Sequence, residues 1–163
     1  MTVKDLKIVK PNYFVIPAIT IVVAWLKKYL FMAGAAWFKG LQMPAYMPPM
    51  WFQIFAWKSI FIYTTLTLVL LWNIYPHTQR FWHIISLFIA NAFFLLLGHY
   101  LFFVRHHLGA ALFCVIAVAL TLWTIVWMLW DKGYRLLAGL LLPYAILVCV
   151  GLYNVNALWL LNS

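Results

Sequence analysis

Long apolar runs separated by short polar links dominate the sequence. The runs cover about residues 13–33, 48–72, 81–103, 109–130 and 136–161. A helix needs about 20 mostly apolar residues to cross a hydrocarbon core about 30 Å thick, and each run is close to that length. Apolar and polar residues do not alternate with a period of two, so the runs are not typical of barrel strands. The pattern predicts an all-α integral membrane protein, with residues 1–163 forming one domain of five transmembrane helices.

The links predict how these helices are arranged. Most links are short, and short links place consecutive helices side by side and antiparallel in a bundle. The link between the first two helices, about residues 34–47, is the longest and ends at Pro48-Pro49. Because it also carries aromatic residues, we expect it to fold over the bundle as a lid. An odd number of spans places the two termini on opposite sides of the membrane.

The composition excludes a soluble protein. Hydrophobic residues make up 68% of the chain and charged residues 8%, whereas soluble domains carry about 25% charged residues. The net charge is +9, but the basic residues are scattered among apolar runs. A lipid bilayer with anionic headgroups is therefore the expected partner, and nucleic acid is not.

The distribution of basic residues also bears on orientation, because Lys and Arg are more frequent on the cytoplasmic side. The N-terminal side holds Lys4, Lys7, Lys10, Arg80, Lys132 and Arg135, and the opposite side holds Lys27, Lys28, Lys39 and Arg105. The excess favours a multi-pass protein with its N-terminus inside. Lys27 and Lys28, near the end of the first run, are expected to extend toward the headgroups.

Few residues are suited to catalysis. The only acids are Asp5 and Asp131, which lie at segment ends, so an enzyme with paired carboxylates is excluded. Cys114 and Cys149 lie inside apolar runs and are expected to be small buried hydrophobic residues. The sequence shows no pair of a nucleophile and a base and no metal cluster. We therefore expect no catalytic residue and no metal site, and a protein that is not an enzyme is favoured over an enzyme.

The stretch from Trp37 to Trp57 carries a recognisable motif. It resembles the pattern W-[YF]-x-x-L-x-K-P-x-W-x-P-P of the translocator protein family, also called tryptophan-rich sensory proteins or peripheral benzodiazepine receptors. The matching residues are Trp37, Phe38, Leu41, Pro44, Pro48, Pro49 and, eight residues further on, Trp57. Met43 and Tyr46 stand where the family has Lys and Trp.

Two shorter motifs also resemble this family. Phe102-Phe103 precedes Gly109 with the family's spacing, and Pro143-Tyr144 repeats a pair found in its fifth helix. Leu147 stands where the family usually has Trp, and Leu95 occupies the position of the family's helix-three Asn. The chain therefore resembles a divergent member. The sterol-recognition pattern expected near the C-terminus is absent, so sterol binding is not carried over.

The resemblance implies a function. It implies a membrane receptor or binding protein for a planar hydrophobic ligand such as a tetrapyrrole, either porphyrin or haem, with a role in transport or sensing. It implies no required cofactor and a homodimer. Two alternatives stay open: an enzyme that degrades porphyrin with light and oxygen, and an accessory subunit that binds no ligand.

The resemblance and the helix spacing indicate candidate ligand-binding residues. Pro44, Tyr46 and Trp57 match positions that line or close the family's pocket. Tyr144, Leu147, Gly151 and Asn154 recur at helical spacing on one face of the last helix, either as a slot for a planar ring or as ordinary packing. The remaining candidates are Trp37 in the motif and Asn91, about one turn before the family's helix-three Asn.

Two polar residues inside the spans are further candidates. Lys58 lies nine residues after Pro49, about 14 Å into its helix, with Trp51 on the same face. It could anchor a porphyrin propionate, its ammonium could extend along Trp51 to the membrane surface, or burial could leave it deprotonated. His99 could ligate haem iron or form a hydrogen bond to a neighbouring helix.

Overall fold

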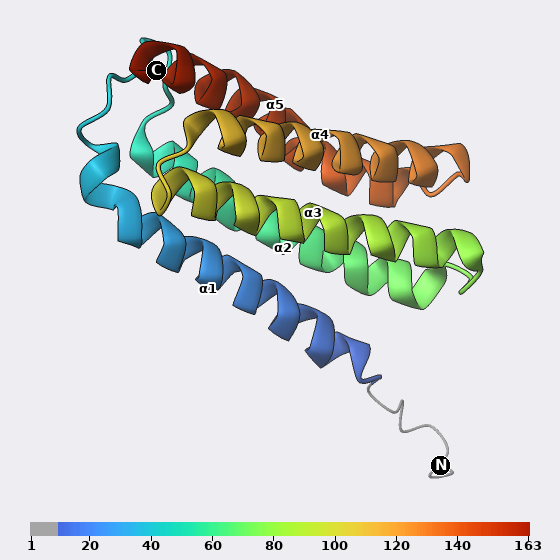
Figure 1. Cartoon of the computed structure of the whole chain (residues 1–163). Helices are drawn as coiled ribbons and strands as arrows, with labels where there is room; N and C mark the ends of the chain where they lie inside the picture. The colour runs from blue at the N-terminus through green and yellow to red at the C-terminus, as the bar shows by residue number, and fades with distance from the viewer. Residues whose placement is uncertain (1–9) are drawn as a thin grey trace, which may run out of the picture.

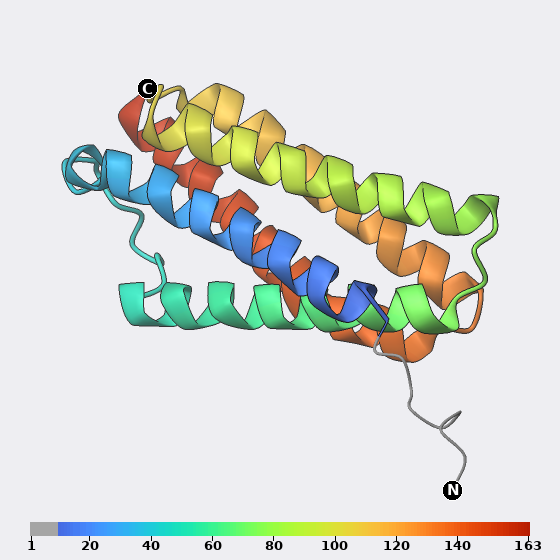
Figure 2. The ribbon, with the colours of Figure 1, turned by 90° about the horizontal axis from the view of Figure 1, so that it is seen from below.

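The computed structural model describes residues 10–163, which form five α-helices (Figure 1). They are α1 (Asn12–Phe38), α2 (Met50–Ile74), α3 (Gln79–Phe103), α4 (Leu108–Asp131) and α5 (Arg135–Asn162). The described residues contain no strand, and each helix is long and apolar enough to cross a membrane. The predicted all-α, five-span architecture is confirmed. The start of α1 and the end of α5 lie at opposite ends of the bundle (Figures 1 and 2).

Nearly all the predicted helix ends lie within two residues of the observed ones, and the end of α1 is the exception. The prediction ended the first span near residue 33, but α1 continues to Phe38. The small residues Gly34, Ala35 and Ala36 favour a loop in the sequence, but in the structure they continue the helix. The loop between α1 and α2 therefore covers residues 39–49 rather than 34–47.

The helix contacts form a closed ring. Going round it, α1 contacts α3, α3 contacts α4, α4 contacts α5, α5 contacts α2, and α2 contacts α1. Within the described residues, the backbones of α2 and α3 do not come into contact. Large side chains of these two helices do meet, as Trp57 does with His99 and Trp72 with Phe81. The ring therefore leaves interior space between α2 and α3.

Helix α1 crosses this space obliquely (Figure 2). Its C-terminal half lies on α3, where the backbone at Gly34 packs directly against the backbone of Phe103. Its N-terminal half lies on α2, where the Thr65 hydroxyl donates a hydrogen bond of 2.7 Å to Thr20 Oγ1. Small residues permit such close helix approach in lipid, and polar side chains link helices there. Helix α1 thus bridges two helices whose backbones do not touch.

An ion pair stabilises the end of the bundle at which α2 joins α3 and α4 joins α5. Arg80 Nη2 lies 2.9 Å from Asp131 Oδ2 and donates a second hydrogen bond, of 3.0 Å, to the Met128 carbonyl. Asp131 carries the only acidic side chain in the described part of the chain. The Asp131 carboxylate is therefore paired with Arg80 at this end of the bundle.

The contact between Gly34 and Phe103 yields a prediction about stability. A Cβ atom at Gly34 would clash with the Phe103 carbonyl oxygen and lie 2.8 Å from its carbonyl carbon and Cα. We expect Gly34→Ala to lower the free energy of unfolding by about 1–3 kcal/mol, since α1 must move away from α3. Unfolding titrations in mixed micelles measure this change.

Gly139→Ala is the matched control, because a Cβ atom at Gly139 meets nothing within 4 Å. It should leave stability unchanged or raise it by up to about 1 kcal/mol through helix propensity. Equal stability of Gly34→Ala and wild type would contradict the close packing of α1 on α3.

Candidate functional site

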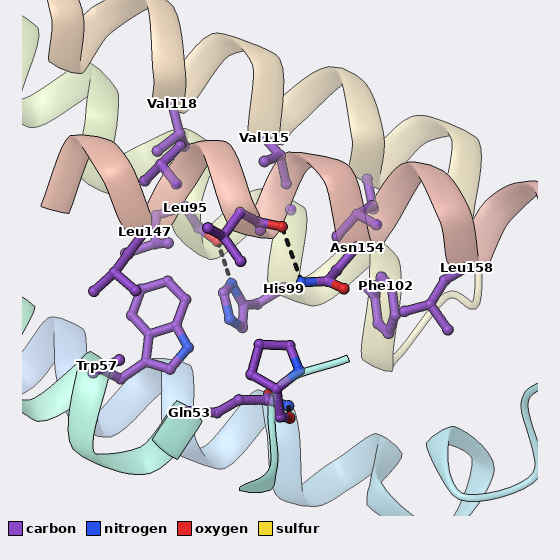
Figure 3. Close-up of a pocket in the computed structure, with 18 of the residues that line it drawn as sticks. Gln53, Trp57, Leu95, His99, Phe102, Val115, Val118, Leu147, Asn154 and Leu158 are labelled. Atoms are coloured by element: carbon purple, nitrogen blue, oxygen red, sulfur yellow. Dashed lines mark hydrogen bonds between the residues drawn. The ribbon is translucent and has the colours of Figure 1, made fainter. Parts of the chain in front are cut away.

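A cavity of about 200 Å³ lies inside the ring (Figure 3), and we call it the central cavity. Its walls are mostly apolar and come from α2, α3, α4 and α5, with Phe38 of α1 at one end. The labelled lining residues in Figure 3 are Gln53, Trp57, Leu95, His99, Phe102, Val115, Val118, Leu147, Asn154 and Leu158. Concave apolar sites with a few polar groups are typical of ligand-binding sites.

The loop at residues 39–49 contributes two residues to the lining of the central cavity. Met47 and Pro48 of this loop line the cavity, and the Pro48 carbonyl accepts a hydrogen bond of 2.7 Å from Gln53 Nε2. The loop is also joined to the end of α5. The backbone N–H of Gln42 donates to Asn162 Oδ1 at 2.9 Å, and Asn162 Nδ2 donates to the backbone carbonyl of Gln42 at 3.1 Å. This position agrees with a lid, whose opening remains a prediction.

His99 presents a hydrogen-bond acceptor to the central cavity. Its Nδ1 lies 2.8 Å from the Leu95 carbonyl oxygen, one turn earlier on α3. Because a carbonyl can only accept, Nδ1 carries the proton, and a neutral ring then has a lone pair on Nε2. The hydrogen bond is within α3 rather than to the neighbouring helix that the sequence suggested as one possibility. The ring also stands edge-on to the Trp57 indole, with centroids 5.7 Å apart.

Asn154 provides a second acceptor. Its side chain is 8% exposed, and its Nδ2 donates to the Val150 carbonyl at 3.0 Å. This partner fixes the orientation of the amide. Asn154 Oδ1 is buried and has no hydrogen-bond partner among the described residues. A buried polar atom without a partner is costly, so a ligand that donates a hydrogen bond here would be favoured.

Lys27 is a polar residue near the cavity that the sequence analysis did not select. Its Nζ lies over the face of the Trp57 indole, 3.7 Å from the ring centroid. The sequence suggested that Lys27 and Lys28 both extend toward the headgroups. In the structure Lys28 is exposed, but Lys27 is partly buried between α1 and α2. No sequence signal separated these adjacent lysines, because the crossing direction of α1 decides which one faces Trp57.

A second cavity, of about 230 Å³, lies between α1, α2 and α3, with Tyr144 of α5 among its lining residues. Asn91 also lines it, and Asn91 Oδ1 accepts a hydrogen bond of 2.9 Å from the Tyr144 hydroxyl. Asn91 Nδ2 donates to the Val118 carbonyl and to Thr121 Oγ1 on α4, each at 2.9 Å. Asn91 and Tyr144 therefore join three helices as well as lining a cavity.

The structure brings only some of the predicted residues to the central cavity. Trp57, His99, Leu147 and Gly151 line it, as does Asn154 on the same face of α5 as Leu147 and Gly151. The predicted slot on α5 therefore faces the interior, apart from Tyr144, which lines the second cavity.

The other predicted residues lie outside both cavities. Trp37 stacks on His106 with centroids 4.1 Å apart, and Pro44 is buried within the loop. Tyr46 is 83% exposed and Trp51 is 70% exposed. Lys58 is exposed on the outer surface of α2, so its side chain does not reach the central cavity. In the described residues, no group of three metal-ligating side chains comes together.

The sequence model of the TspO/MBR family matches residues 11–160. The chain therefore belongs to the TspO/MBR family, and it is a multi-pass integral membrane protein. None of the curated proteins matches the chain. Family membership supports a ligand-binding or transport role in the membrane.

The link between the loop and α5 yields a prediction about loop motion. Asn162→Ala removes both hydrogen bonds to Gln42. A hydrogen bond of this kind stabilises the folded protein by about 1 kcal/mol. Without it, the backbone amide of Gln42 should exchange its hydrogen about fivefold faster. Hydrogen–deuterium exchange measured across residues 39–49 tests this expectation. Asn156→Ala on the same helix is the control and should change nothing, and unchanged exchange in Asn162→Ala would show that the link does not hold the loop.

The hydrogen bond between Tyr144 and Asn91 yields a second prediction. Tyr144→Phe leaves the buried Asn91 Oδ1 without its donor, so the free energy of unfolding should fall by about 1–2 kcal/mol. Tyr153→Phe, at a residue 56% exposed on the same helix, should have no effect. Unfolding titrations of the two variants measure this difference. Equal free energies of unfolding would show that the hydrogen bond between Tyr144 and Asn91 does not contribute to stability.

Proposed function

We propose that this member of the TspO/MBR family binds a planar, hydrophobic ligand of the tetrapyrrole type in the central cavity, as a receptor or transporter. The observation that carries the proposal is the combination of an apolar cavity, an aromatic wall and two inward acceptors. Trp57 forms the wall, and the acceptors are His99 Nε2 and Asn154 Oδ1.

The chemistry of these groups favours a flat ring with N–H donors. The Trp57 indole offers an aromatic surface, and aromatic rings associate favourably in stacked or edge-on arrangements. The pyrrole N–H groups of a metal-free tetrapyrrole are donors that His99 Nε2 or Asn154 Oδ1 can accept. Since a neutral imidazole nitrogen also ligates iron, His99 Nε2 is equally suited to the iron of haem.

The central cavity is smaller than a tetrapyrrole needs. About 200 Å³ is below the range of about 300–1,000 Å³ for sites that hold drug-sized ligands. A tetrapyrrole therefore requires the cavity to widen. Helix α1 is the least buried of the five helices, and we propose that the cavity widens by movement of α1.

Titration of protoporphyrin IX into the protein in phosphatidylcholine nanodiscs tests the proposal. We expect saturable quenching of tryptophan fluorescence with one ligand bound per chain, and the ligand recovered chemically unchanged in the dark and in light. Quenching that rises linearly, as in empty nanodiscs, would contradict binding. Light-dependent loss of the porphyrin would instead favour the enzymatic alternative.

Blocking the central cavity gives a residue-level prediction. Gly151 lines the central cavity, and a Cβ atom there meets nothing within 4 Å, so a larger side chain can begin to fill the cavity. We expect Gly151→Leu to weaken protoporphyrin binding by a factor on the order of ten or more, because the side chain takes space that the ring needs. The change is measured by the same titration.

Gly139→Leu is the control, since Gly139 lies on the same helix, also has open space around it, and lines neither cavity. It should bind like the wild type. If both variants bind normally, the ligand does not occupy the central cavity.

A further inference from the structure

We propose that Lys27 binds an anionic group, such as a carboxylate, on the ligand of the central cavity. The proposal rests on the proposed function, because it names the cation that holds the charged end of that ligand. Lys27 is assigned this role through its position over Trp57, which is also a wall of the cavity.

The depth of Lys27 in the membrane makes its charge unusual. It lies eleven residues before the end of α1 at Phe38, which corresponds to about 16 Å along the helix. A charged side chain at such depth is costly, and those that occur usually have a partner or a function. Because Lys27 is partly buried between helices, its ammonium does not simply extend into the lipid.

No carboxylate in the described part of the chain neutralises Lys27. Asp131 pairs with Arg80 at the opposite end of the bundle. The contact that the structure gives Lys27 is the face of the Trp57 indole, 3.7 Å from Nζ. A cation–π contact compensates part of the lost hydration, but an indole face does not satisfy all three N–H donors of the ammonium. An anion beside the Trp57 indole can accept a hydrogen bond from this ammonium.

The surrounding groups determine what kind of anion fits. His99 stands edge-on to the same indole that Lys27 covers. A ligand whose ring lies along Trp57 and His99 can therefore direct an acidic substituent toward Lys27. The acceptors inside the cavity are suited to N–H groups, whereas Lys27 on α1 is suited to a carboxylate. This arrangement selects a planar aromatic acid over its neutral ester.

Lys58 provides a matched control within the same chain. It follows Trp57 directly in the sequence and lies at a similar depth, but it is exposed on the outer surface of α2. Replacing either lysine by methionine removes one positive charge and keeps a long apolar chain. Any effect of net charge on partitioning of an acid into the membrane will therefore appear in both variants.

The experiment compares protoporphyrin IX with its dimethyl ester, each titrated into protein in phosphatidylcholine nanodiscs. The proteins are wild type, Lys27→Met, Lys27→Arg and Lys58→Met. We expect Lys27→Met to bind the acid about ten- to a hundredfold more weakly, the range of one charge-assisted hydrogen bond, and to bind the ester as wild type does. Lys27→Arg should retain most of the preference for the acid, and Lys58→Met should behave as wild type.

Normal binding of the ester by Lys27→Met also shows that this variant is folded. Loss of both ligands or of neither in Lys27→Met would overturn the assignment, as would the same acid-selective loss in Lys58→Met. Failure of wild type to bind either porphyrin would instead overturn the proposed function, so the two failures are distinguishable.

Discussion

The close packing of α1 on α3, at Gly34 and Phe103, is the interaction on which the rest of the structure depends. The backbones of α2 and α3 stay apart, and α1 can bridge them only because one of its residues has no side chain at the crossing point. Without a hydrophobic driving force between helices in lipid, such close packing is a main source of helix association. The closed ring, and the space inside it, follow from this contact.

The oblique course of α1 also determines the chemistry around that space. The inner helices contribute an apolar wall with acceptors at His99 and Asn154. Helix α1 contributes the cation Lys27, held against Trp57. Because α1 is also the least buried helix, we propose both that its movement admits the ligand and that its Lys27 binds the charged end of the ligand. A ligand that bridges Trp57 and Lys27 would hold α1 against α2 and stabilise the closed ring.

Features that depend on a single helix could be predicted from the sequence. Run length gave the five spans, and motif spacing selected Trp57, Leu147 and Gly151, which line the central cavity. Features that depend on how two helices cross were not predictable. The first run was expected to end near residue 33, which placed Lys27 near the membrane surface, but α1 continues to Phe38 and its crossing over α2 places Lys27 on Trp57.

The most direct test of the central claim is ¹⁹F NMR of protein labelled with 5-fluorotryptophan, which reports on each of the 10 tryptophans. We predict that saturating protoporphyrin IX shifts the Trp57 resonance, which is assigned from the spectrum of Trp57→Phe. The resonances of Trp51 and Trp127, which are 70% and 65% exposed on the outer surface, should not move. Shifts at Trp51 or Trp127 with an unchanged Trp57 resonance would place the ligand on the outer surface and contradict a site inside the ring.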